Sequence, residues 1–284
     1  MKICRMMLYS EYISDEKMLK AIENSFNHMH KNYICVYEKN FNHTLPSKLN
    51  MELLNEISLK YKNTEILVIK EKEIGANQED KPNQVETKLR NHILKIATTK
   101  GNDFIYLQDI DEFLFPEDYE WLEKMYLPAM RKNDFVFAAM KILHFWKNKN
   151  YILTNHEEKY YDSFDYIVNS DNPQVTNGFW QNFIIDLTKE VVIENISHID
   201  GNKYRKSWIF EDRFIYHSSF TLNDQETKKK ISTWGHSTDM NFEEWYEKKW
   251  LNWNPETTDL HPSVTPHLWK KAIPFEKPLP REFV

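Results

Sequence analysis

The amino-acid sequence predicts an α/β fold built around a mostly parallel sheet. Short apolar runs alternate with stretches of helical periodicity through the first 115 residues. Strands that are separated by helices are typical of parallel sheets with right-handed crossovers. After Pro116 the pattern changes to short apolar runs and an aromatic-rich region, so we expect a second half of different construction.

Four strands and three helices are predicted in the first half. The strands are expected at Ile3–Leu8, Tyr33–Tyr37, Glu65–Ile69 and Phe104–Gln108. The helices are expected from Ser14 to about His30, at Pro46–Tyr61 and at Asn83–Thr99. Serine is a preferred helix N-cap and proline suits a first helical turn, which places two of the helix starts at Ser14 and Pro46.

The second half is predicted to hold short strands between two helices. The helices are expected at Tyr119–Lys132 and Asn241–Trp253, and the strands at Phe135–Phe145, Phe183–Leu187, Val191–Ile193, Ser207–Phe210 and Phe214–His217. Residues 147–178 show no regular pattern. Aromatic side chains lie along one face of the last helix, so we expect that face to be buried. The proline-rich tail from Pro255 is expected to be extended coil.

The composition is that of a globular protein large enough to bury a sizeable core. Of 284 residues, 41% are hydrophobic and 28% charged, which excludes a disordered chain. No apolar run approaches the roughly 20 residues that cross a bilayer. The polar start predicts no secretory signal, hence a cytoplasmic chain without a membrane span. Cys4 and Cys35 lie in apolar runs and are expected to be reduced core residues.

The net charge of -6 is unevenly distributed along the chain. Residues 201–284 hold 13 basic and 12 acidic side chains, so the acidity belongs to the first 200 residues. This balance excludes a general nucleic-acid binder, although a local basic patch remains open.

Two aspartates follow the fourth predicted strand. The apolar run leads into Asp109-Ile110-Asp111-Glu112, and side chains one residue apart on an extended chain point the same way. The carboxyl end of a strand is where α/β sheets bind ligands. Carboxylate oxygens select Mg²⁺ or Mn²⁺. Phosphate groups of the substrate usually complete the coordination shell of such an ion. The motif therefore predicts a cation site at Asp109 and Asp111, with an ordinary acidic turn as the alternative.

One helix earlier the chain carries Lys88-Leu89-Arg90-Asn91. In this order the chain resembles the nucleotide-sugar glycosyltransferases of the GT-A type, particularly family-2-like enzymes. Their helix carries Arg-Asn before a strand that ends in Asp-x-Asp or Asp-x-Asp-Glu. The resemblance covers residues 1–116 well and the remainder loosely. It implies a Rossmann-like GT-A sheet flanked by helices, with an aromatic-rich acceptor lobe and a helical C-terminal extension.

The resemblance divides the chain into three parts. Residues 1–116 would bind the nucleotide sugar, residues 117–235 would form the acceptor side of the same catalytic domain, and residues 236–284 would be a C-terminal helix and proline-rich tail. The donor-binding residues that it implies are Tyr9, Glu11, Glu38, Lys88, Arg90 and Asp109. Arg90, and with it Lys88, would face the nucleotide or hold the two aspartates, and a solvated helix face is the alternative.

The resemblance also implies a Mn²⁺ or Mg²⁺ ion that bridges the donor diphosphate and neutralises the leaving group. Asp111 would bind the ion directly, and Asp109 would contact ribose or reach the ion through water. A histidine often completes such sites, and His217 is chosen here, with His198 and His236 as competitors. A buried core histidine is the alternative reading of His217.

An inverting transfer needs a carboxylate that takes the proton of the acceptor hydroxyl. Glu211 and Asp212 are the first candidates because family-2-like enzymes carry a Glu-Asp pair on the acceptor side, and Asp200 is the next. The pair lies five residues before His217, closer than the family pattern leads us to expect. Inverting and retaining chemistry both stay open.

The acceptor is expected to be a hydroxyl of a saccharide or glycoconjugate, held by the aromatic residues of 144–181. One alternative is a hydroxymethylated DNA base, as in phage-type DNA-modifying glycosyltransferases, favoured by basic clusters within residues 203–206 and 228–230. Another is a haloacid-dehalogenase-type phosphatase, in which Asp109 would attack phosphate. A non-catalytic sugar- or nucleotide-binding module is a further reading.

Overall fold

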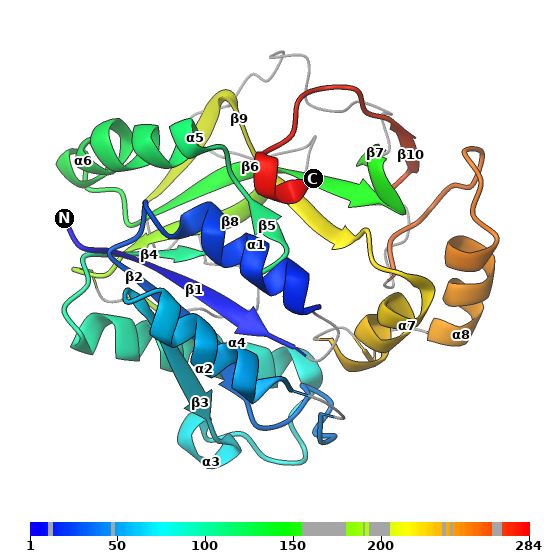
Figure 1. The fold of residues 1–284 in the computed structure, drawn as a ribbon, viewed down its shortest axis with the longest axis horizontal. Helices are drawn as coiled ribbons and strands as arrows, with labels where there is room; N and C mark the ends of the chain where they lie inside the picture. Colours follow the sequence, from blue (N-terminus) through cyan, green and yellow to red (C-terminus); the bar gives the residue numbers. More distant parts are fainter. Residues whose placement is uncertain are drawn as a thin grey trace.

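The computed structural model describes residues 1–10, 14–46, 49–154, 180–189, 191–192, 205–234, 237–238, 241–262 and 269–284; of residues 180–183 and 208–212 only the backbone is described. Within these ranges ten strands join in one sheet, and helices cover both of its faces (Figure 1). The fold is thus α/β and Rossmann-like, as the sequence predicts. None of the helices in these ranges combines the length and the apolar character needed to cross a membrane.

The first half is a parallel sheet in the order β4-β1-β2-β3. Its strands are β1 (Ile3–Tyr9), β2 (Lys31–Tyr37), β3 (Thr64–Ile69) and β4 (Phe104–Leu107). Side chains alternate along β1, so Met7 packs under α1 (Asp15–Ser25) and α2 (Met51–Lys60), while Met6 packs against α4 (Pro82–Thr99). A short helix, α3 (Glu71–Ile74), precedes α4.

The strand order reverses between β1 and β4. The chain runs from β1 outward through β2 to β3, and then returns to place β4 on the other side of β1. The helix after β1 and the helix before β4 therefore lie on opposite faces of the sheet, and the carboxyl ends of these two strands form its reversal point. This is the position at which open α/β sheets bind ligands.

The second half extends the sheet beyond β4 with mostly antiparallel strands. Its strands are β6 (Phe137–Trp146), β7 (Asn148–Thr154), β8 (Trp180–Asp186), β9 (Lys206–Phe220) and β10 (Lys271–Pro274), with β9 parallel to β6. A two-residue strand, β5 (Glu112–Phe113), pairs with β9 directly after the acidic turn. The helices α5 (Pro116–Trp121) and α6 (Leu127–Lys132) are joined by a π-helical turn at Leu122–Tyr126.

The C-terminal elements pack on the far end of β6 through an aromatic cluster. They are α7 (Asp224–Thr233), α8 (Phe242–Trp245), a π-helical turn at Tyr246–Leu251, β10 and a 3-10 turn at Arg281–Phe283. The predicted aromatic face of the last helix is buried: Trp245, Tyr246 and Trp250 are all less than 9% exposed. Trp146 of β6 lies at the centre of this cluster.

Several predicted boundaries were wrong for local reasons. The first helix begins at its predicted Ser14 cap but ends at Ser25. The second begins at Met51, because the Asn50 side chain caps Leu53 N and no helical turn starts at Pro46. The two strands predicted between residues 207 and 217 form one long strand, β9. The strands β5 and β7 and the helices α3 and α7 were not predicted, and β10 lies in the tail expected to be coil.

Candidate functional site

A buried arginine in β1 holds the acidic turn, which is formed by residues 109–112 after β4. Arg5, inside β1, has no exposed surface. Its guanidinium donates hydrogen bonds to the carbonyl oxygens of Gln108 (3.3 Å), Asp109 (2.8 Å) and Glu112 (3.2 Å), and to that of Ala21 in α1 (2.8 Å). Because a guanidinium presents several fixed donors, one side chain sets the path of the whole turn.

Asp109 is oriented by α4. Arg90 Nη2 donates to Asp109 Oδ2 at 2.9 Å, and the same guanidinium bonds Glu86 at 2.8 and 3.0 Å. Both acids raise the pKa of Arg90 although burial opposes them. The Oδ1 atom of Asp109 is buried and has no hydrogen-bond partner among the described residues. The predicted pairing of Arg90 with the acidic turn is therefore present.

Asp111 is enclosed by cations. Its Oδ2 atom accepts a hydrogen bond from Lys230 Nζ at 3.1 Å, and its Oδ1 atom lies 3.4 Å from His217 Nε2. Burial by itself would raise the pKa of Asp111, but Lys230, His217 and Lys17 outweigh it and hold that pKa well below its usual range. At 6% exposed, Asp111 is a buried carboxylate among basic side chains that favour its charged form.

Two further side chains surround this carboxylate. His217 Nδ1 lies 2.8 Å from His144 Nδ1, and burial, assisted by His217, holds the pKa of His144 well below its usual range. Lys17 of α1 donates to the carbonyl oxygen of Ser218 at 3.3 Å. Burial lowers the pKa of Lys17 to about 8, with Asp111 acting in the opposite direction.

The fit of a divalent cation to this turn can be judged from its donors. Within the described residues no group of three or more histidine, cysteine, aspartate or glutamate side chains is placed to hold a metal ion. One oxygen of Asp111 is already bonded to an ammonium group. A cation at Asp111 would have to displace Lys230, so these side chains, as arranged, do not fit one. The predicted Mn²⁺ or Mg²⁺ site stays a prediction.

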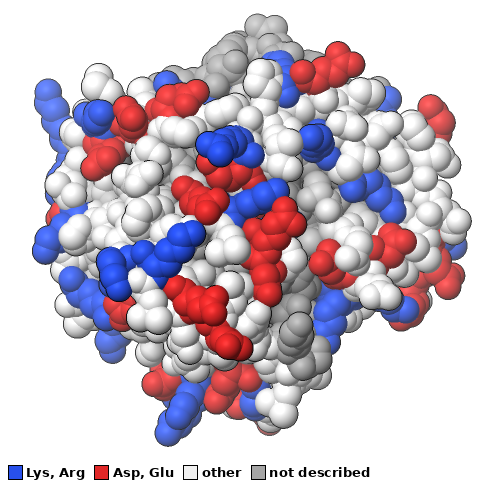
Figure 2. All heavy atoms as spheres, in the orientation of Figure 1, with Lys and Arg blue, Asp and Glu red and all other residues white. Residues whose placement is uncertain are grey.

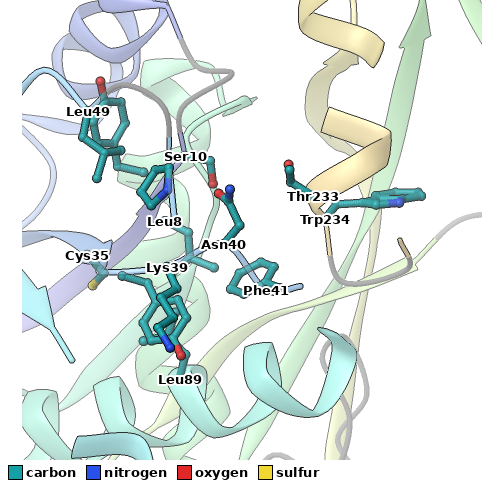
Figure 3. A pocket seen from close by; sticks show the side chains of 13 residues that line it. Leu8, Ser10, Cys35, Lys39, Asn40, Phe41, Leu49, Leu89, Thr233 and Trp234 are labelled. Carbon is teal, nitrogen blue, oxygen red and sulfur yellow. The ribbon is translucent and has the colours of Figure 1, made fainter. Parts of the chain in front are cut away.

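A hollow opens at the carboxyl ends of β1 and β2. Its lining includes Leu8, Tyr9, Ser10, Cys35, Tyr37, Lys39, Asn40, Phe41, Pro46, Leu49, Leu89, Thr233 and Trp234. Thr233 and Trp234, at the end of α7, lie across the hollow from Asn40 and Phe41 (Figure 3). Aromatic walls with a few polar groups are typical of small-molecule sites.

Tyr37 gives this hollow a polar group that lacks a partner. Its ring stacks on Phe41 with centroids 6.4 Å apart and an interplanar angle of 27°. Its hydroxyl is buried and makes no hydrogen bond to any described residue. Buried hydroxyl groups are normally bonded, so the Tyr37 hydroxyl is a candidate contact for a ligand in the hollow.

The remaining donor-side predictions have different outcomes. Tyr9 lines the hollow, and its hydroxyl accepts a hydrogen bond from Asn50 N at 3.4 Å. Glu38 accepts from Glu71 N at 2.6 Å and so supports α3. Lys88 bonds Asp80 at 2.6 Å and Gly75 O at 3.0 Å, and thus ties the loop before α4. Neither Glu38 nor Lys88 lines the hollow.

Some predicted residues lie outside the described residues: Glu11, His198, Asp200 and His236. The side chains of Glu211 and Asp212 are not described, but their backbone belongs to β9, at the register shift between Ile209 and Phe214. Phe214 and His217 are three strand residues apart, so the Glu-Asp pair is separated from His217 by roughly 10 Å or more along β9. Their role as catalytic base stays a prediction.

In the part of the second basic cluster that the structure describes, the lysines do not form a stripe. Lys228 is paired with Glu243 on the surface at 3.0 Å, whereas Lys230 is buried against Asp111. Lys203 and Tyr204 of the first cluster lie outside the described residues. On the face shown in Figure 2, acidic and basic side chains are interspersed. Neither cluster therefore supports the DNA alternative.

The roles of three residues at the acidic turn were missed from sequence, although His144 was expected among the acceptor-side residues 144–181. Arg5 had a detectable signal, since a charged residue interrupts an otherwise apolar strand. Lys230 looked like part of a solvated lysine run, and only the helical phase of α7 buries it. His144 lay in an apolar run, and its contact with His217 depends on the β6–β9 register, which pairs these two residues.

No protein-family model matches the chain, and no curated protein matches it. Among solved structures, the inositol-1-phosphate CTP transferase of T. maritima is 11% identical, with 82% of this chain and 96% of that chain covered and a TM-score of 0.36. UDP-glucose pyrophosphorylase complexed with UDP-glucose is 11% identical, with 77% and 90% covered and a TM-score of 0.31. Scores this low do not establish a common fold, so what the chain binds must be inferred from its own residues.

Proposed function

We propose that the chain is a nucleotide-sugar-dependent glycosyltransferase whose donor lies over the carboxyl ends of β1 and β4. The observation that supports this best is that three features lie at one edge of the sheet. The reversal point of the sheet, the aromatic hollow and the Arg90-bound Asp109 all lie at the same edge. A nucleotide needs an apolar platform for its base, acceptors for ribose and positive charge for its phosphates.

Each of these needs has a candidate group at that edge. Phe41 and Trp234 offer aromatic faces for the base. The carboxylate of Asp109, whose side chain is 27% exposed, would accept a ribose hydroxyl. Lys17 and Lys230 would place positive charge near the diphosphate. The sugar would then face the second half of the sheet, where the predicted acceptor side lies.

A thermal-shift screen tests this proposal. We expect a uridine or guanosine diphosphate sugar to raise the melting temperature, because a ligand that binds only the folded state stabilises it. The Trp234→Ala variant should bind about tenfold more weakly, since base stacking contributes about 1–3 kcal/mol. Trp253→Ala is the matched control: both tryptophans pack partly buried on the same aromatic cluster, but only Trp234 lines the hollow. Equal losses in both variants would contradict the assignment.

The same screen separates the other readings. CTP or UTP with a sugar 1-phosphate is included, because the solved structures above are named as enzymes of that chemistry; pyrophosphate release would favour a nucleotidyl transfer. A phosphatase would release phosphate from a model ester. That reading requires attack by Asp109, whose Oδ2 is bonded to Arg90 and whose Oδ1 is buried. All samples are run with Mn²⁺ and with EDTA, so that the predicted metal requirement is measured directly.

The Tyr37→Phe variant tests the nucleotide site itself. We expect stability to be unchanged or raised by up to about 1 kcal/mol, because the substitution removes an unpaired buried hydroxyl. We expect donor affinity to fall about fivefold, because a hydrogen bond to the ligand is lost. Calorimetric titration and thermal unfolding measure the two effects. A loss of stability with unchanged affinity would mean that the hydroxyl serves the fold instead.

A further inference from the structure

We propose that the ammonium group of Lys230 is the resident cation of Asp111 and occupies the place that the resemblance assigns to a divalent metal ion. On the proposed function, on which this part of the inference rests, the donor diphosphate would then be neutralised by Lys230 and Lys17 and would not require a metal ion at Asp111. Three observations support the inference: the contacts of Lys230, the charge balance of the turn, and the elements that hold the two side chains.

Lys230 is built into the site rather than resting on its surface. It is 5% exposed, and its Nζ donates both to Asp111 Oδ2 at 3.1 Å and to the hydroxyl of Ser219. On the other side, Ser218 donates to the carbonyl oxygen of Asp111 from its backbone N (2.7 Å) and from its hydroxyl (3.1 Å). Carboxylate and ammonium are thus both fixed by β9, which leaves little freedom for the pair to separate.

Helix α7 fixes the other end of the lysine. Asn223 and Glu226 form a reciprocal cap at its start, with hydrogen bonds of 2.9 and 3.0 Å. Lys230 lies two turns later, on the side that packs toward Asp111, whereas Lys228 on the same helix is exposed and paired with Glu243. The capped helix therefore fixes the backbone of Lys230, whose side chain contacts Asp111.

The charges at the turn are already balanced by protein groups. Asp109 is paired with Arg90, Asp111 with Lys230, and the buried Glu112 lies near Arg5. Lys17 adds another positive charge, with Glu226 and Asp111 as its acidic neighbours. A divalent ion at Asp111 would add two positive charges beside a buried ammonium, where like charges repel strongly. The described groups are arranged for a metal-free Asp111.

The two lysines come from helices on opposite sides of the turn, α1 and α7, and converge on one carboxylate. Lysine is a point charge that binds phosphate without a fixed geometry. A diphosphate that approaches this turn would meet the ammonium groups of Lys230 and Lys17, which the protein itself supplies. Donor binding is then expected to persist in EDTA, in contrast to a site whose charge depends on a loaded metal.

The inference is tested with MnCl₂ alone, without any nucleotide. In wild-type protein, Asp111 should contribute nothing to any rise in melting temperature that Mn²⁺ causes. Lys230→Ala should uncover the Asp111 carboxylate beside His217 and so create a Mn²⁺ site, with a rise of about 5 °C at saturation and one equivalent of Mn²⁺ lost from the free-ion EPR signal. The double variant Lys230→Ala with Asp111→Asn should lose both effects. Lys228→Ala, which removes the same charge from the surface of the same helix, should behave as wild type.

Two results would overturn the inference. The first is a Mn²⁺ signal in wild-type protein that disappears in Asp111→Asn, because it would place the metal on a carboxylate that we assign to Lys230. The second is a folded Lys230→Ala protein that binds no Mn²⁺. Should Lys230→Ala fail to fold, Lys230→Met and the wild-type arm decide the same question. If no nucleotide sugar binds under any condition, the proposed function fails while the Mn²⁺ result still stands.

Discussion

Arg5→Ala is expected to lower the free energy of unfolding by about 4 kcal/mol and the melting temperature by about 10 °C. The reason is the number of carbonyl groups that one side chain satisfies. Three lie in the turn at residues 108–112, and the fourth, that of Ala21, lies in α1. Without the guanidinium these buried oxygens lose their donor, and the acidic neighbours Glu112, Asp109 and Asp111 lose a nearby positive charge.

The Arg5→Lys variant tests whether the positive charge of Arg5 or the geometry of its guanidinium group stabilises the turn. Lysine keeps the positive charge but cannot match the fixed fork of a guanidinium, so we expect it to recover only part of the stability. If the turn also positions the donor, this folded variant should bind the nucleotide sugar more weakly than wild type. Lys2→Ala is the control, because it removes a positive charge from an exposed position next to β1 and should change stability by less than about 0.5 kcal/mol. A drop of less than 3 °C for Arg5→Ala would contradict this account of the turn.

The first half of the fold was predictable because its signals are local. The apolar runs of β1 to β4 are separated by helices with caps, and buried parallel strands read as continuous apolar segments. The second half was harder, because β9 carries polar residues through a register shift and β7 begins with Asn148, Lys149 and Asn150, which are exposed. Pairing with distant strands, not local propensity, makes these segments extended.

The candidate site shows the same division. The pairing of Arg90 with Asp109 was expected from the order of helix and strand, and it is present. The partner of Asp111 was not foreseeable, because Lys230 is 119 residues away in the chain and reaches it only after β9 and α7 are placed. A sequence pattern can indicate that a carboxylate lies at a strand end. Whether a metal ion or an ammonium group neutralises it depends on tertiary packing.

Trp146 is expected to decide whether the C-terminal elements fold together with the sheet. It has no exposed surface, and its ring lies 5.2 Å from that of Trp250, 5.6 Å from Phe220 and 6.1 Å from Trp245. A further contact, 6.4 Å to Trp269, reaches the segment that leads into β10. One side chain of β6 thus joins the α8 region and the tail to the sheet. We therefore propose that residues 241–284 unfold together with the central sheet, although the sequence alone suggested a separate helix and tail.

Trp146→Ala should lower the free energy of unfolding by about 3–5 kcal/mol, because it leaves a cavity inside this cluster. Trp146→Phe is the matched variant: it retains a ring and removes an indole N–H that has no partner among the described residues, so it should cost less than about 1.5 kcal/mol. Thermal unfolding followed by tryptophan fluorescence and by far-ultraviolet circular dichroism should give one coincident transition in wild type. In Trp146→Ala, limited proteolysis should cut first after residue 240. An early, separate transition of wild-type protein would show instead that the C-terminal elements fold independently, since a segment docked through a fully buried tryptophan cannot leave before the cluster opens.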